Sequence, residues 1–136
     1  MNLLDENIPL DQRDLLRAWG IHCRVVGQDI AQLSIGDDNI VVLLQRLKQP
    51  TLFTRDEDFF QRELCHPGYG IFWLDVAPEE AALFVRRVLR HPRFATKTGR
   101  LGIVARAHHD GLQFWQRNRA ARQRAAWPGS GRHPPR

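Results

Sequence analysis

The segment GIFWLDVAPEEAALFVRRVLRH, residues 70–91, joins an unbroken apolar run to an amphipathic one. The run over 70–74 is typical of a strand that is buried on both faces. Residues 79–91 carry apolar side chains at helical spacing, with acids at the start and arginines at the end, where they complement the helix dipole. A buried strand followed by an amphipathic helix is one βα unit, which indicates a parallel sheet.

The same alternation extends to both sides of this unit. Further strands are predicted at 1–4, 22–26 and 51–54, with helices at 9–19 and 37–47 and a short helix ending near 67. Residues 27–36 are predicted to form a loop, and 99–115 a hairpin that turns at 109–111. The order βαβαβαβα followed by a hairpin predicts an α/β fold, a three-layer α/β/α sandwich with a mostly parallel central sheet and a C-terminal hairpin.

Length and composition fit one globular domain. The chain has 136 residues, of which 43% are hydrophobic and 26% charged. It contains no long apolar run and no signal peptide pattern, so neither a membrane span nor export is expected. Two cysteines, Cys23 and Cys65, are compatible with a reducing compartment. We therefore expect a cytoplasmic protein.

Positive charge is concentrated at the C-terminus. The net charge is +5, and residues 117–136 contain six arginines and no acid, which leaves 14 basic against 15 acidic residues in 1–116. We therefore divide the chain into a domain over 1–116 and an Arg-rich, disordered tail over 117–136. The tail either contacts RNA phosphates or is a solvated extension. The candidate phosphate-binding residues of the tail are Arg117, Arg119, Arg122 and Arg124.

Acidic side chains follow the predicted strands. Asp5 comes after the strand at 1–4, whereas Asp56 and Asp58 come after the strand at 51–54. Asp37 and Asp38 open the helix between the second and third strands. Ligands of open α/β sheets bind beyond the carboxyl ends of strands. Clustered carboxylates repel one another, so either the pKa of one of them rises or a cation compensates their charge. The pattern therefore predicts a site for Mg²⁺ or Mn²⁺.

Two alternatives accompany this metal site. Each acid also suits a purely structural role, since Asp56 and Asp37 are placed to cap helices and Asp5 to cap a turn. A zinc site made by His22-Cys23 and Cys65-His66 is disfavoured, because neighbouring residues of a strand point to opposite faces.

The stretches LLDENIP, residues 3–9, and TLFTRDEDFF, residues 51–60, resemble the PIN-like domains, in particular the short LLDENLP branch that is similar to VapC toxins. The resemblance covers about 1–115. It implies a metal-dependent ribonuclease with a ligand set that corresponds to Asp5, Asp37, Asp56 and Asp58. Supporting positions correspond to Asn7, Thr54 and Asp38, which is able to exchange roles with Asp37, and Arg55 is placed to meet a phosphate.

The chain departs from this pattern in its middle helix. Many VapC toxins carry a glutamate there, whereas this chain has Asp37 and Asp38 at the helix start. The resemblance also implies an antitoxin partner and a homodimer. The leading hypothesis is a Mg²⁺- or Mn²⁺-dependent endoribonuclease, a hydrolase that acts as the toxin of a toxin–antitoxin pair. The alternative is a non-catalytic RNA-binding or protein-interaction module on the same fold.

Overall fold

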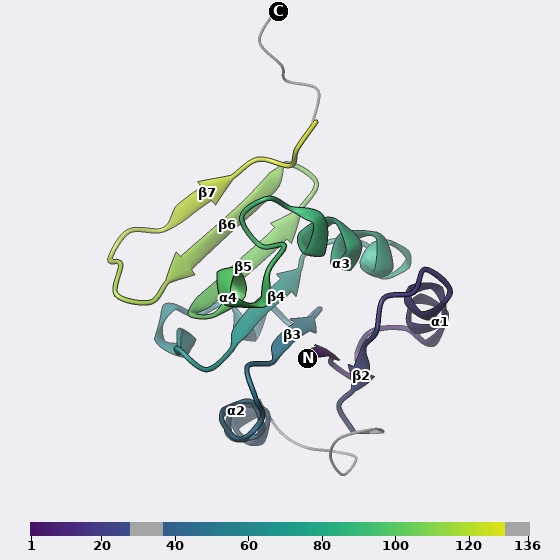
Figure 1. The fold of residues 1–136 in the computed structure, drawn as a ribbon, viewed down its shortest axis with the longest axis horizontal. Coiled ribbons are helices and arrows are strands. Elements are labelled where there is room, and N and C mark those ends of the chain that lie inside the picture. Colours follow the sequence, from purple (N-terminus) through teal and green to yellow (C-terminus); the bar gives the residue numbers. More distant parts are fainter. Residues whose placement is uncertain (28–36, 130–136) are drawn as a thin grey trace, which may run out of the picture.

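Seven strands form a single sheet in the order β2-β1-β3-β4-β5-β6-β7 (Figure 1). The computed structural model describes residues 1–27 and 37–129. The strands span Asn2–Leu4 (β1), Arg24–Val25 (β2), Thr51–Thr54 (β3), Gly70–Leu74 (β4), Ile103–His108 (β5), Gly111–Gln116 (β6) and Gln123–Ala125 (β7). The predicted loop over 28–36 and the end of the tail over 130–136 lie outside the described residues.

The sheet is mostly parallel. Strands β2, β1, β3, β4 and β5 pair in parallel, whereas β6 and β7 extend the sheet with antiparallel pairings. The predicted mixed α/β class and the hairpin formed by β5 and β6 are confirmed. Strands β1, β3, β4 and β5 end at the same side of the sheet, which is called the carboxyl edge below.

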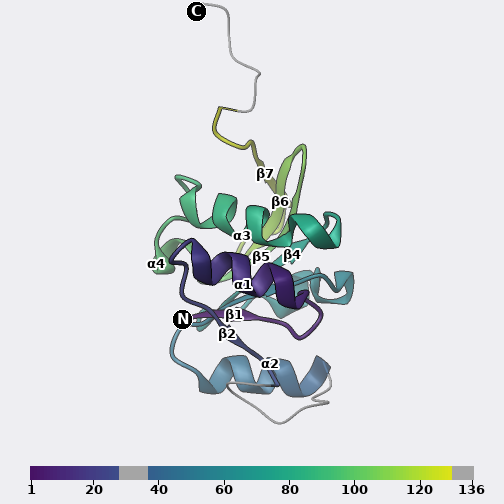
Figure 2. The ribbon, with the colours of Figure 1, turned by 90° about the vertical axis from the view of Figure 1, so that its right-hand side faces the viewer.

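Helices lie on both faces of the sheet. The α-helices span Leu10–Ala18 (α1), Asp37–Arg46 (α2), Ala81–Arg90 (α3) and Lys97–Arg100 (α4), and 3₁₀ turns span Glu57–Phe59 (η1), Arg62–Leu64 (η2) and Pro78–Glu80 (η3). In Figure 2, α1 and α3 lie on one side of the strands and α2 lies on the other. The predicted short helix before Pro67 is instead the pair of 3₁₀ turns η1 and η2.

Two apolar clusters pack against the two faces. One contains Phe53, Phe72 and Phe114 together with the buried side of α3. The other contains Leu52, Ile71 and Val104 together with α2, η1 and η2. Within each strand, successive side chains thus pack into different clusters, because side chains alternate between the two faces of a sheet.

The structure differs from the expectation of a disordered tail beginning at Arg117. Residues 123–125 pair with β6 as β7, and Trp127 is 2% exposed. The indole Nε1 of Trp127 donates a hydrogen bond of 2.6 Å to the carbonyl oxygen of His108, and its ring packs edge-on against Phe84. This segment is ordered because β7 pairs with the edge strand β6 and because Trp127 packs against apolar side chains beside α3. Amino-acid composition alone does not predict either contact.

None of the helices in the described part of the chain has the length and apolar character needed to cross a bilayer.

Candidate functional site

The Asp5 carboxylate is the centre of the candidate site. It directly follows β1 at the carboxyl edge and is only 5% exposed. Its Oδ2 accepts a hydrogen bond of 2.7 Å from the hydroxyl of Thr54, the last residue of β3, and its Oδ1 accepts one of 2.8 Å from the backbone N–H of Glu6. These contacts orient both oxygens of a buried carboxylate.

Asn7 links the ends of β1 and β3 further. Its Nδ2 donates to the Thr54 hydroxyl at 3.3 Å and, over a longer 3.5 Å, to Oδ2 of Asp5. Its Oδ1 accepts from the backbone N–H of Arg55 at 3.1 Å. The Asp5–Asn7–Thr54 cluster, named for these three side chains, is therefore a closed network that unites two segments almost fifty residues apart.

Asp56 joins this network through its backbone. Its N–H donates to the Thr54 hydroxyl at 3.0 Å, while its side-chain Oδ1 accepts from the N–H of Asp58 at 2.9 Å. Asp56 is thus the N-cap of η1, which was the structural alternative derived from the sequence. The Asp58 side chain is exposed. Asp56 therefore contacts the cluster directly, whereas Asp58 is connected to it through its hydrogen bond to Asp56.

The side chains of Asp37 and Asp38 lie outside the described part of the structure. Their backbone begins α2. Helix α2 ends only a few residues before β3 starts, and ten helical residues span about 15 Å. Because β3 starts at the opposite side of the sheet, the start of α2 lies toward the carboxyl edge, in agreement with Figure 2.

The fit of a divalent cation is partial. Carboxylate, amide and hydroxyl oxygens of the kind found in Asp5, Asn7 and Thr54 are suitable ligands for Mg²⁺. However, among the residues whose side chains are described, no three Asp, Glu, His or Cys side chains approach closely enough to hold a metal ion. The described acids alone therefore do not form the predicted metal centre, and a complete one needs a further carboxylate.

Arg55 extends the site toward β4. Its Nη2 lies 3.5 Å from the carbonyl oxygen of Val76, in the segment that connects β4 to α3. Its Nε is buried and has no hydrogen-bond partner within the described residues. A buried guanidinium N–H without a partner is unusual, so this position is suited to an additional acceptor.

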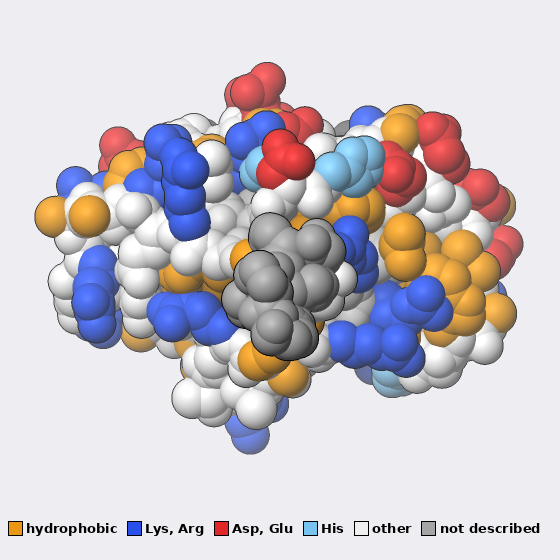
Figure 3. Space-filling view, turned by 90° about the horizontal axis from the view of Figure 1, so that it is seen from above, with side chains coloured by type: hydrophobic (Ala, Val, Ile, Leu, Met, Phe, Trp, Pro, Cys, Tyr) orange, Lys and Arg blue, Asp and Glu red, His pale blue; other side chains and the backbone are white. Residues whose placement is uncertain are grey.

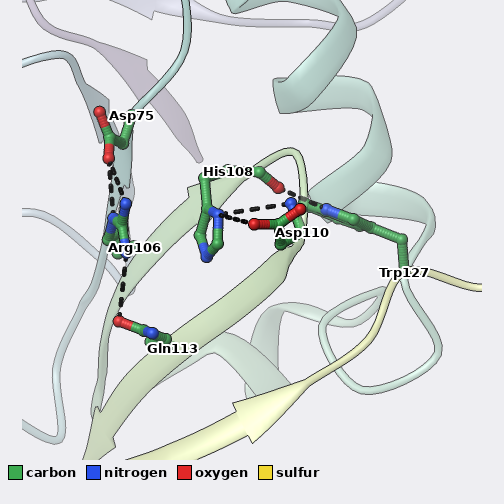
Figure 4. A network of polar contacts seen from close by, with 6 residues as sticks. All are labelled: Asp75, Arg106, His108, Asp110, Gln113 and Trp127. Carbon is green, nitrogen blue, oxygen red and sulfur yellow. Dashed lines mark hydrogen bonds and ion pairs between the residues drawn. The ribbon is translucent and has the colours of Figure 1, made fainter. Parts of the chain in front are cut away.

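Sequence reasoning missed a second polar network at the carboxyl edge (Figure 4). Asp75 follows β4 as Asp5 follows β1, and its Oδ2 accepts from Nε and Nη2 of Arg106 at 2.8 and 2.7 Å. Nη1 of Arg106 lies 3.4 Å from the side-chain oxygen of Gln113. The signal available in the sequence was the position of Asp75 directly after the GIFWL strand.

His108 ends β5 within this second network. Burial and the nearby Arg106 charge lower its pKa, while Asp110 and Asp75 act in the opposite direction. The backbone N–H of Asp110 donates to its Nδ1 at 3.3 Å. His108 is thus biased toward the neutral form, in which one ring nitrogen is able to accept a proton.

Charge is unevenly distributed over the surface. In Figure 3, acidic side chains lie along one margin of the face in view, and Lys and Arg side chains spread over the remainder. The four predicted phosphate-binding arginines of the C-terminal segment are all exposed, with Arg124 in β7 and the others between β6 and β7. These residues are Arg117, Arg119, Arg122 and Arg124.

The disfavoured zinc site is not assembled. Cys23 packs against the cluster of α1 and α3, whereas Cys65 packs against the cluster on the opposite face. The His66 ring instead stacks on Tyr69 and accepts a hydrogen bond from the N–H of Gly68.

Comparison with known proteins gives no relative. No family model, no curated protein and no solved structure matches the chain.

Proposed function

We propose that this chain is a metal-dependent endoribonuclease of PIN-like type with a three-layer α/β/α fold. The observation that supports it best is the buried Asp5 carboxylate, oriented by Thr54 and Asn7 where two adjacent parallel strands end. Ligand sites of open α/β sheets lie at this position. Its coincidence with the LLDENIP and TRDEDF motifs favours a nuclease over a chance cluster of caps.

Each residue then has a distinct role. Asp5 supplies the inner carboxylate for Mg²⁺ or Mn²⁺, with Asp56 beside it, Asp58 further out and Asp37 or Asp38 completing the set. Thr54 and Asn7 position the Asp5 oxygens, and Arg55 meets a phosphate of the substrate. When bound, such a cation lowers the pKa of water and stabilises charge on the phosphodiester under attack.

The direct test is cleavage of labelled single-stranded RNA with Mg²⁺, with Mn²⁺ and with EDTA. We expect cleavage by the wild type only when a divalent ion is added. Asp5→Asn removes the charge but keeps the shape, so it should abolish cleavage. Asp56→Asn should reduce it strongly. Circular dichroism verifies that both variants remain folded.

Asp14→Asn is the matched control, because Asp14 is an exposed acid of α1 whose ion pair with Arg17 lies on the surface. This variant should cleave like the wild type. A thermal melt adds a second readout, since an ion that binds the folded state raises the melting temperature of the wild type but not of Asp5→Asn. Cleavage that persists undiminished in Asp5→Asn would refute the assignment.

A non-catalytic RNA-binding or protein-interaction module is the second candidate. It is favoured by the capping role of Asp56 and by the incomplete metal set among the described side chains. Under this alternative, RNA binds in EDTA without being cut and no divalent ion raises the melting temperature. An antitoxin partner and a homodimer remain predictions of the resemblance, and a cytoplasmic location remains a prediction from composition.

A further inference from the structure

A row of side chains crosses the sheet from the Asp5–Asn7–Thr54 cluster to its far edge. Thr54 on β3 is paired with Trp73 on β4, and Trp73 with Arg106 on β5. Arg106 is paired with Gln113 on β6, and Gln113 with Arg124 on β7. Paired residues of neighbouring strands project from the same face. The row therefore continues, without a change of face, from the proposed active site to the Arg-rich segment.

This face reaches solvent at the three positions of the row on β5, β6 and β7. The alternate residues of β5 and β6, which face α3 and Trp127, are fully buried, as Ala105, Leu112 and Phe114 illustrate. In contrast, Arg106 and Gln113 are half-buried and Arg124 is exposed. The described helices thus cover one face of β5, β6 and β7, whereas the other face is buried at Val104 but reaches solvent at Arg106, Gln113 and Arg124.

The chemistry of the row is cationic and aromatic. The Arg106 guanidinium carbon lies 5.5 Å from the centre of the Trp73 ring, and Asp75 and Gln113 hold its nitrogens from either side. Arg124 has no ion-pair partner among the described residues. A held guanidinium group beside a half-buried indole, with a second arginine further along the row, is typical of surfaces that contact phosphates and bases together.

We propose that single-stranded RNA lies across this face, from Arg124 over Arg106 and Trp73 to Asp5. Four strand spacings separate Thr54 from Arg124, a distance of about 19 Å. Arg124 and Arg106 bind phosphates, with the polar Gln113 between these two arginines, and Trp73 offers an aromatic surface to a base. This inference rests on the proposed ribonuclease function for the nature of the strand, and it assigns substrate-binding roles to residues outside the motifs.

Charge complementarity and continuity with the site favour RNA over an acidic protein. A polynucleotide presents both phosphates and bases, which matches a row that offers two guanidinium groups next to an aromatic ring. The row also leads to the carboxylate proposed to act on that polymer. An acidic protein surface would satisfy the arginines but would leave the Trp73 contact and the path to Asp5 without a purpose.

The test measures binding separately from cleavage. A fluorescein-labelled single-stranded RNA is titrated with the full chain in EDTA, and anisotropy gives the Kd at several salt concentrations. Arg124→Ala should weaken binding several-fold and lower the salt slope by about 0.7, the value for one phosphate contact to a single strand. Arg106→Gln should act in the same direction. Trp73→Leu should weaken binding about tenfold, as expected when one base loses its stacking partner.

Arg17→Ala is the control, since Arg17 is an exposed arginine of α1 on the other side of the sheet. It should leave the Kd within twofold of the wild type. Arg124 is exposed in an edge strand, so its variant stays folded, and circular dichroism verifies this. Equal effects of Arg17→Ala and Arg124→Ala would show non-specific charge attraction and overturn the path.

The outcomes separate this inference from the proposed function. Weaker binding by the Arg124 and Arg106 variants, together with no cleavage in any metal, supports the path and refutes the nuclease. Metal-dependent cleavage with unchanged binding by both variants refutes the path and leaves the nuclease standing. No binding of RNA by the wild type in EDTA also overturns the path.

Discussion

Thr54 donates its hydroxyl proton to Asp5 across 2.7 Å, although the two residues are 49 positions apart in the sequence. The contact exists because β1 and β3 are parallel neighbours with Leu4 opposite Phe53, so the next residue of each strand reaches the carboxyl edge together. The same hydroxyl oxygen accepts from the N–H of Asp56. One threonine thereby fixes the distance between both motifs of the candidate site.

Thr54→Val tests this arrangement. Valine keeps the shape of threonine but removes the donor to Asp5 and the acceptor for Asp56, so buried polar groups lose partners. We expect the free energy of unfolding to fall by about 1–3 kcal/mol. Urea denaturation monitored by tryptophan fluorescence measures the change. Thr98→Val, at an exposed position in α4, is the control and should change stability by less than about 0.5 kcal/mol.

The variant also separates positioning from general stability. If Thr54 orients Asp5, metal-dependent cleavage by Thr54→Val should fall at temperatures at which the protein is still fully folded. Thr54→Ser restores the hydroxyl and should recover most of the activity. Equal activity of the valine and serine variants would contradict the positioning role.

The sequence predicted the inner part of the site because it depends on local patterns and one topological rule. Asp5 and Thr54 each end a short apolar run, and parallel strands bring such ends to one edge. The βα order predicted the edge for Asp5 on the condition that the first and third strands are neighbours, and the family resemblance added Thr54. The capping role of Asp56 was also foreseen, since it requires only the residues that follow it.

The second polar network and the burial of Trp127 depend on tertiary contacts that local sequence patterns do not predict. The Arg106 charge meets Asp75 because β4 and β5 are neighbours with a particular register, which composition and periodicity do not determine. Trp127 was assigned to a disordered tail because its surroundings are rich in Gly, Pro and Arg. Its burial depends on a gap beside Phe84 that only the assembled α3 and hairpin create.

Trp127→Ala tests whether the C-terminal segment stabilises the fold. The indole is almost completely buried, lies under the Arg87 guanidinium and packs edge-on against Phe84. Its removal leaves a large cavity, so we expect the free energy of unfolding to fall by about 3–5 kcal/mol. Differential scanning calorimetry or urea denaturation gives the value. A loss below about 0.5 kcal/mol, equal to that of the exposed control Arg119→Ala, would show that this segment does not stabilise the fold.

Glu80 should make stability depend on pH in the acid range. Its Oε2 lies 2.8 Å from Nε2 of His109, and the hydrogen bond from His109 together with the N–H of Ala77 lowers its pKa from the usual 4.5. A carboxyl group whose pKa is lower in the folded state stabilises the fold above its unfolded pKa, and this contribution disappears as pH falls through the folded pKa. Glu80→Gln should therefore be less stable than the wild type at neutral pH, and this difference should disappear as pH falls below the folded pKa of Glu80.

Urea denaturation of the two proteins at several pH values measures this convergence. Glu79→Gln is the control, because Glu79 is exposed and makes no hydrogen bond or ion pair among the described residues. Its stability should follow that of the wild type across the range. A difference between Glu80→Gln and the wild type that persists at the lowest pH would assign the effect to packing and not to charge.

The two cysteines should differ in reactivity. Burial raises the pKa of Cys23 to about 11, so at pH 8 about one molecule in a thousand carries the reactive thiolate. Burial also raises the pKa of Cys65, but a backbone hydrogen bond with Val104 and the charge of Arg62 oppose the shift.

In the Cys65→Ser variant, the remaining thiol should react with a disulfide reagent far more slowly in the folded protein than in urea. The Cys23→Ser variant should show a smaller difference, because Cys65 has the less perturbed thiol. Equal rates for Cys23 in folded and unfolded protein would mean that the segment between α1 and β2 opens readily, and the packing described for this side of the sheet would then be wrong.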